Sequence, residues 1–333
     1  MSQSPRAILS ALPLPMLLTF AAFASLPLWI KAVGLYPYLG VEVMIWIIYA
    51  LGFNLLLGYA GLPSFGHGAY FGVGAYAFGL TQMHLSSNLW VCLVAAIFMG
   101  GISGALVATF ISHRRGIYYA LLTIAFGQIF WFVSIKWHSV THGEDGLLNI
   151  KRMPADLGFF ALDLQKLDNL YYFAFAVFVV VVLLLWRLVH SPFGRVLAAI
   201  KQNETRASFV GYNVWAYKWL AFTLSTLVAG VAGGLFALAQ QSAYPNVMSL
   251  HQSGFIVMMA LVGGGLVSFW GPLLGAVLFF IARDLLGAYT EAWLLWYGLL
   301  FMGIVLFRPE GLAGAWNDFL RRKAKDVRSK ALA

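Results

Sequence analysis

Long apolar runs, separated by short polar or glycine-rich breaks, occupy almost the whole chain. A helix that crosses the hydrocarbon core of a bilayer needs about 20 mostly apolar residues, because it rises about 1.5 Å per residue through about 30 Å. We predict spanning helices at ten ranges: 10–30, 38–58, 62–83, 89–111, 117–137, 169–189, 217–240, 253–267, 271–290 and 292–307. The expected fold is an all-α membrane protein, a polytopic bundle of about ten transmembrane helices forming one domain over 1–333. Nine or eleven helices are also compatible, because only short breaks interrupt 253–307.

Two polar segments interrupt the pattern. Residues 138–168 carry both signs of charge and are predicted to be either a solvated loop or a docking surface or lid over a path through the membrane. Residues 190–215 alternate apolar and charged positions at helical spacing, which predicts a short amphipathic helix and then a turn at Gly211. The positions concerned are Val196, Ile200, Ala207 and Val210, among Arg195, Lys201, Glu204 and Arg206. This helix could lie on the membrane surface or bind a cytoplasmic partner.

Glycine is concentrated in GYAGLPSFGHGAYFGVGAY, residues 58–76. Broken backbone at membrane depth is tolerated only beside protein or a water-filled cavity, so we predict a discontinuous or re-entrant element next to a pathway. A short echo, GLPSF at 61–65 against GLVSF at 265–269, hints at an internal repeat. Glycines four residues apart also predict close helix packing: Gly68 and Gly72, Gly100 and Gly104, Gly230 and Gly234, Gly271 and Gly275.

Composition and charge agree with a membrane protein. Hydrophobic residues make up 61% and charged residues 10% of the 333 residues, against about 25% charged in soluble domains. The net charge of +9 needs no nucleic acid to explain it, because most lysines and arginines fall in loops that alternate to one side. The positive-inside rule then places both termini, residues 190–215 and the basic tail 308–333 in the cytoplasm, and 138–168 outside.

Two features of the chain leave alternatives open. Arg6, the first apolar run and Ala22-Phe23-Ala24 resemble a signal peptide, but the run is long for one, so an uncleaved first helix is the preferred interpretation. The single cysteine, Cys92, lies in an apolar run, so no disulfide can form within the chain.

Polar residues within or near the predicted spans are few, and each is expected to face the bundle interior or an interface. They are Glu42, Asn54, His67, Gln128, Arg283, Asp284 and Glu291. Asn54, His67 and Gln128 are candidates for lining a pathway, although a structural hydrogen bond is the preferred interpretation of His67. The sequence has no HExxH, GxSxG, CxxC or GxxxxGK[ST] motif, so we expect no catalytic residue, metal site or cofactor, and no enzyme.

Five blocks resemble the LivM-type permease of branched-chain amino acid ABC transporters. They are ALGFNLLLGYAGLPSFGHGAYFGVGAYA (50–77), THGEDGL (141–147), SPFGRVLAAIKQNETRASFVGYNVWAYKWLAF (191–222), LVGGGLVSFWGPLLGA (261–276) and FRPEGLAG (307–314). The resemblance implies an inner-membrane permease that pairs with a second, LivH-like permease, two cytoplasmic ATPase subunits and a periplasmic substrate-binding protein. It also implies that ATP is bound by other chains.

The family gives the cytoplasmic segment a role. ABC permeases carry a loop of the form EAA, three residues and glycine, which docks into the ATPase. Aligned on Gly211, the glutamate position falls on Thr205 and the alanines on Arg206 and Ala207, while Glu204 stands one place early. Arg195, Glu204, Arg206, Ala207 and Gly211 are therefore the expected ATPase-coupling residues.

Two other classes of protein remain for comparison. An ion-coupled secondary transporter should place carboxylates at mid-membrane, and a membrane enzyme should cluster catalytic polar residues at one depth. The sequence shows neither pattern clearly, and it does not identify the substrate beyond amino acids or related amides.

Overall fold

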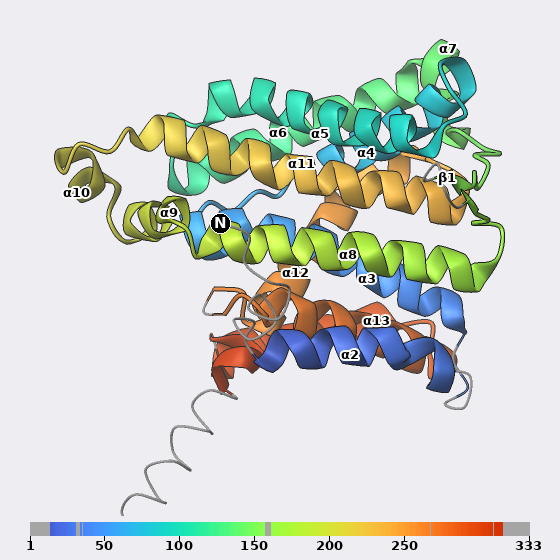
Figure 1. The fold of residues 1–333 in the computed structure, drawn as a ribbon. Helices are drawn as coiled ribbons and strands as arrows, with labels where there is room; N and C mark the ends of the chain where they lie inside the picture. Colours follow the sequence, from blue (N-terminus) through green and yellow to red (C-terminus); the bar gives the residue numbers. More distant parts are fainter. Residues whose placement is uncertain are drawn as a thin grey trace, which may run out of the picture.

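The computed structural model describes residues 14–315 apart from 31–33, 35, 157–160, 267 and 309, and this part is an α-helical bundle (Figure 1). A helix lies at each of the ten predicted ranges within it. These helices are α2 Leu14–Trp29, α3 Pro37–Asn54, α4 Gly68–His84, α5 Leu89–Ile111, α6 Gly116–Lys136, α8 Leu167–Val189, α11 Val214–Gln240, α12 Leu250–Gly263, α13 Gly271–Tyr289 and α14 Trp293–Phe307. The all-α membrane fold is confirmed.

Helix length separates two groups. Six helices are long and apolar enough to cross a bilayer: α3 with its extension to Ala60, α5, α6, α8, α11 and α13. Helices α2, α12 and α14 are apolar but shorter, and α4, with 17 residues, is not among the six either. The count of about ten membrane spans therefore stays a prediction.

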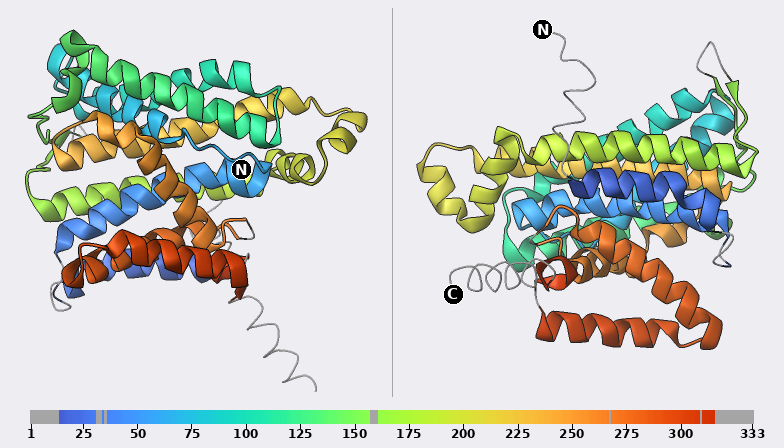
Figure 2. Two further views of the ribbon diagram at one scale, coloured as in Figure 1. Left: turned by 180° about the vertical axis from the view of Figure 1, so that it is seen from behind. Right: turned by 60° about the horizontal axis from the view of Figure 1, so that its bottom comes forward.

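The helix packing explains the sequence pattern. Helix α3 is buried on nearly every face, which is why its apolar run has no polar stripe. Helix α11 packs against α3, α4 and α5, and glycine allows the close approach: a Cβ on Gly100 would lie 2.9 Å from the Cα of Gly230. All four predicted glycine pairs contact a neighbouring element in this way. Figure 2 shows α13 and α14 at one edge of the bundle.

The first helix belongs to the bundle as described. Helix α2 runs through Ala22-Phe23-Ala24 and packs on α8, with the rings of Phe23 and Phe178 5.4 Å apart. The Tyr171 hydroxyl donates a hydrogen bond to the Phe23 carbonyl. Whether this segment is cleaved stays open, and the basic tail predicted at 308–333 lies mostly outside the described residues.

The predicted glycine-rich break is present. A π-helical turn, η1 (Leu55–Ala60), extends α3 to Gly61, whose φ of +69° ends it, and regular helix resumes only at Gly68. The predicted span 62–83 was therefore wrong over its first six residues. Helix α12 ends in the same way at Gly264, with φ +90°, before α13 begins at Gly271. The two breaks match Gly61 with Gly264, whereas the sequences GLPSF (61–65) and GLVSF (265–269) match Gly61 with Gly265. The two alignments therefore differ by one residue.

Three charged residues of α3 and α13 form a cluster. Arg283 of α13 holds Glu42 of α3 through two hydrogen bonds of 2.8 and 3.1 Å, and its Nε donates to Asp284 at 2.8 Å. The Glu42 side chain is only 14% exposed. This ion pair joins α3 to α13.

The two polar segments lie at opposite ends of the bundle. Helices α9 (Pro192–Gln202) and α10 (Glu204–Phe209) project from one end, and α7 (His138–Thr141) and β1 (Ala155–Asp156) lie at the other (Figures 1 and 2). The remaining short elements are η2 Gly143–Asp145, β2 Ala161–Leu162, antiparallel to β1, and η3 Pro245–Met248.

The described part of segment 138–168 makes specific contacts with the bundle. Leu147 is fully buried and exchanges backbone hydrogen bonds of 2.7 and 2.8 Å with Ala243, just after α11. Gln82 of α4 bonds Lys151 through both its amide atoms. Residues 147–151 are therefore held across the ends of α4 and α11.

This arrangement makes the topology testable. In a Cys92→Ala background, we expect Ser139→Cys to react with an impermeant thiol reagent from the outside and Thr205→Cys only after the membrane is opened. The charge bias requires this difference, and both positions are exposed. Labelling of both from one side would contradict the topology.

Candidate ATPase-coupling segment and polar core

The predicted amphipathic helix is two helices. Pro192 starts α9, where its missing N–H costs no hydrogen bond. Asn203 then adopts an extended φ of −162° and its Oδ1 accepts the Arg206 N–H at 2.9 Å, which ends α9 and caps α10. Because of this break, Val210 does not share the apolar face as expected.

The segment packs through a small apolar cluster of its own. Val196, Ile200 and Ala207 are buried together against Val214 and Tyr217 at the start of α11. Val210, by contrast, is 71% exposed. The buried face holds the segment to the bundle and leaves the tip of α10 free.

That tip presents apolar side chains to solvent. Phe209 is 87% exposed and precedes the turn at Gly211, whose φ of +99° is the positive value expected there. A Cβ on Gly211 would meet nothing within 4 Å, so a side chain would project outward. Beside the tip, His113 and Arg115 of the α5–α6 turn line a recess of about 310 Å³ with α10.

The expected coupling residues divide into two kinds. Arg195 and Arg206 are exposed and make no ion pair with a described residue. Glu204, however, accepts a 3.1 Å hydrogen bond from the Nζ of Lys218, which is 1% exposed. The same Nζ donates to the Arg114 carbonyl at 2.5 Å. Glu204 is thus not a free surface charge; it neutralises a buried lysine.

The pathway candidates do not converge. His67 is fully buried among aromatic rings, with Tyr49 stacked 5.7 Å away and Tyr70 at 5.7 Å. Asn54 lies at the helix break, where a Cβ on Gly58 or Gly265 would approach its Oδ1 to 2.4 or 2.5 Å. Gln128 is half-exposed on α6. Its neighbour Gly127 contacts the broken segment at Gly66, and Thr123 of the same helix accepts the Phe65 N–H at 3.1 Å.

The hydrogen bonds of His67 define its tautomer. The Ser225 hydroxyl lies 2.7 Å from the Gly52 carbonyl and 3.1 Å from His67 Nε2. The hydroxyl has one proton and the carbonyl can only accept, so Nε2 carries the imidazole proton and donates to Ser225. His67 therefore makes the structural hydrogen bond that the sequence left as one alternative.

Several buried polar atoms in the described core around His67 make no hydrogen bond. Among the described residues, the buried His67 Nδ1, both amide atoms of Asn54 and the hydroxyls of Tyr49, Tyr70 and Tyr119 have no hydrogen-bond partner. Buried polar groups normally have one, and an unmade bond costs about 1–3 kcal/mol.

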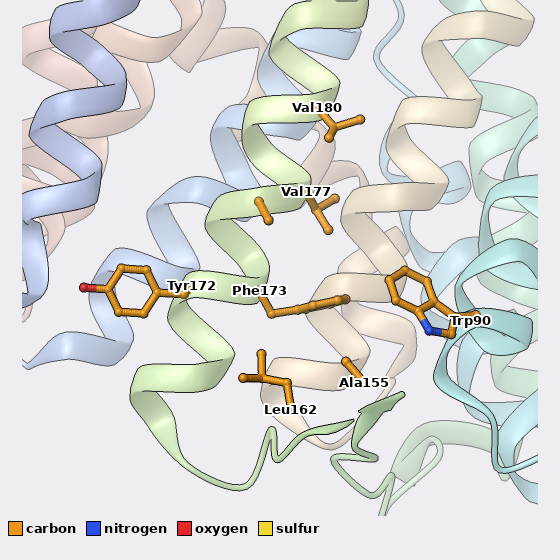
Figure 3. Close-up of a pocket in the computed structure, with 8 residues that line it drawn as sticks. Trp90, Ala155, Leu162, Tyr172, Phe173, Val177 and Val180 are labelled. Atoms are coloured by element: carbon orange, nitrogen blue, oxygen red, sulfur yellow. The ribbon is translucent and has the colours of Figure 1, made fainter. Parts of the chain in front are cut away.

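A larger groove near the end of α8 has a different chemistry (Figure 3). It measures about 480 Å³ and is lined by Trp90, Ala155, Leu162, Tyr172, Phe173, Ala176, Val177 and Val180. The Trp90 indole N–H already donates to the Asp156 carbonyl at 2.7 Å, and the Tyr172 hydroxyl points away from the groove. A zwitterionic solute needs charged or strongly polar partners, so this groove does not suit one.

Comparison with known proteins gives a consistent result. Residues 37–308 match the family model described as branched-chain amino acid transport system / permease component. The chain is 30% identical over 299 residues to the high-affinity branched-chain amino acid transport system permease protein LivM of Escherichia coli, covering 84% of this chain and 70% of that protein.

Two further relatives widen the comparison. A probable branched-chain amino acid transport permease protein LivH of Methanocaldococcus jannaschii is 24% identical, covering 83% of this chain and 90% of the relative. The nucleoside ABC transporter permease protein NupC of Lactococcus lactis is 34% identical over 101 residues, 30% of each chain. No solved structure matches significantly. The chain therefore belongs to the permease-component family of branched-chain amino acid transport systems and is of the LivM type.

Proposed function

We propose that this chain is the membrane-spanning subunit of an ABC importer that carries branched-chain or related amino acids across the bacterial inner membrane, driven by separate ATPase subunits. The observation that carries the proposal is segment α9–α10, which is anchored by a buried face and presents Phe209 and Val210 to solvent. An exposed apolar tip beside a recess suits a partner protein better than open water.

The coupling residues then have distinct roles. Ala207 seats the segment on α11, and Gly211 forms the turn that presents the tip. Arg195 and Arg206 are free to meet acidic groups of an ATPase, while Glu204 joins the segment to Lys218 in the membrane domain. Movement imposed on the tip would therefore reach α11 directly.

The proposed assembly contains further partners. Similarity to both LivM and LivH proteins supports pairing with a second, LivH-like permease in the bilayer. A periplasmic substrate-binding protein would dock on the end that carries 138–168, with both termini of this chain in the cytoplasm. Asn54, His67 and Gln128 remain the proposed pathway residues, the first two through their unpartnered polar atoms.

Ion-coupled transport is less well supported. In the described helices, the intramembrane carboxylates Glu42 and Asp284 both bond Arg283. A carboxylate held by arginine is not free to bind a coupling proton or cation. An ATPase in another chain supplies the driving force without such a group.

The experiment that tests the proposal is Gly211→Trp in the complete transporter. We expect normal membrane insertion, loss of most ATPase co-purification, and leucine uptake lowered by about tenfold or more, because a large side chain projects from the docking tip. Co-purification is measured from detergent-solubilised membranes and uptake with labelled leucine.

A matched control separates docking from backbone strain. Gly34 also has a positive φ, +82°, and open space around its Cβ, but it lies near the other end of the bundle, between α2 and α3. Gly34→Trp should keep ATPase co-purification at the parental level. If Gly211→Trp inserts normally, binds its ATPases and transports at the parental rate, the coupling assignment is wrong.

A further inference from the structure

Lys201 links the coupling segment to both helix breaks. From the end of α9, its Nζ donates to the Gly58 carbonyl at 2.7 Å and to the Leu266 carbonyl at 3.2 Å. Gly58 lies in η1, the end of the α3 unit, and Leu266 lies just beyond α12. One ammonium group therefore bridges two membrane elements that are more than 200 residues apart in the sequence.

The position is electrostatically suited to a cation. The last carbonyls of a helix have no partner within the helix and carry the negative end of its dipole. One such end, that of η1 at Gly58, meets the turn after α12 here, because a Cβ on Gly58 would lie 2.5 Å from the Gly265 carbonyl. In broken membrane helices, exposed carbonyls of this kind bind a cation, and Lys201 supplies that charge from the coupling segment.

The local sequence fits this contact closely. The side chain of Lys201 crosses Gly61, where a Cβ would lie 2.9 Å from its Cγ. Gly61 also needs its positive φ of +69° to end η1, so one residue both terminates the helix and leaves room for the lysine. Lys201 as a whole is exposed, but partial burial of its ammonium lowers the pKa of that group from its ordinary value.

We propose that Lys201 is the positioning residue through which segment α9–α10 holds the breaks at Gly58 and Leu266 together, so that movement of the segment changes their separation. The inference rests on the proposed ATP-driven function and deepens it. The ATPase acts on the tip of α10, α9 moves with it, and the ammonium carries that movement to the ends of α3 and α12. Asn54, beside the same two breaks, then changes its surroundings during the transport cycle.

The test is chemical replacement of the ammonium. Lys201→Cys is made in a Cys92→Ala background, and the complete transporter with its ATPases is reconstituted in vesicles. The new thiol is alkylated with 2-bromoethylamine, which restores an ammonium at nearly the original distance, or with 2-iodoethanol, which adds a neutral group of the same length. Gln202→Cys, exposed on the same helix, is the matched control.

Before alkylation, we expect the ATPases to co-purify and ATP hydrolysis to continue, while leucine uptake per ATP falls about tenfold, as for the loss of charged hydrogen bonds. 2-Bromoethylamine should restore most of the uptake and 2-iodoethanol should not. The Gln202→Cys transporter should keep parental uptake with either reagent.

Each other result overturns the inference. Parental uptake in the unmodified Lys201→Cys transporter shows that the bridge is not used, and equal recovery with both reagents shows that Lys201 only fills space. Failure to insert or to bind the ATPases assigns it a role in assembly instead. Failure of the proposed function is distinct, because the parental transporter itself would then lack ATP-dependent uptake.

Discussion

Glu204→Gln is expected to destabilise the chain far more than a surface substitution does. Lys218 is 1% exposed, and Glu204 is the carboxylate that neutralises it. Removing one partner of a buried ion pair leaves the other charge uncompensated and costs about 3–5 kcal/mol. Since Glu204 is itself 23% exposed, we expect the lower end of this range, measured as a fall in the thermal unfolding midpoint in detergent.

A double-mutant cycle separates the ion pair from other effects of the substitution. In a Lys218→Met background there is no buried charge, so Glu204→Gln should then cost less than about 1 kcal/mol. Arg206→Gln, an exposed change on the same helix, should stay within about 0.5 kcal/mol of the parent. Equal effects of Glu204→Gln in both backgrounds would refute the pairing.

The same pair marks a limit of sequence reasoning. A glutamate in a basic cytoplasmic segment suggests an exposed charge, and exposed pairs contribute only about 0–1 kcal/mol. The sequence did contain a signal for this pair: Lys218 stands in an apolar run, and a lysine inside a membrane helix needs a partner. Arg283 and Glu42 repeat the lesson, since a charge at membrane depth predicts that a partner exists but not which residue it is.

The helices themselves were largely predictable. Apolar runs of bilayer length are specified locally, and the structure places a helix at every predicted range. What the apolar pattern did not predict is where two of the runs break: α12 stops at Gly263 and α4 starts at Gly68. Glycine at positive φ, not polarity, ends α12 and the extension of α3.

The helices of segment α9–α10 were partly predictable from the sequence, but their contacts were not. Helical spacing predicted a helix in 190–215, yet the cap at Asn203 divides it and leaves Val210 exposed, and periodicity does not reveal such a cap. The contacts of Lys201 were beyond prediction for another reason. These contacts require the breaks at Gly58 and Leu266 to lie side by side, which depends on the packing of α3, α12 and α13. No local sequence pattern encodes that packing.

The junction of α12 and α13 gives the second large expected effect. A Cβ on Gly275 would lie 1.8 Å from the Met259 carbonyl oxygen and 3.0 Å from the Gly263 nitrogen. These atoms belong to the backbone of α12, so they can move away only if the two helices separate. Overpacking a close contact costs about 1–3 kcal/mol, and a rigid backbone neighbour places Gly275→Ala at or above the upper end.

The control lies on the same helix. Gly287 of α13 has open space around its Cβ, and alanine is the better helix former by about 1 kcal/mol. Gly287→Ala should therefore leave the thermal midpoint in detergent unchanged or raise it, while Gly275→Ala lowers it by several degrees. Because separating α12 from α13 also moves Leu266 away from Gly58, Gly275→Ala should lower leucine uptake even where the chain remains folded. An unchanged midpoint for Gly275→Ala would show that these helices are not in backbone contact.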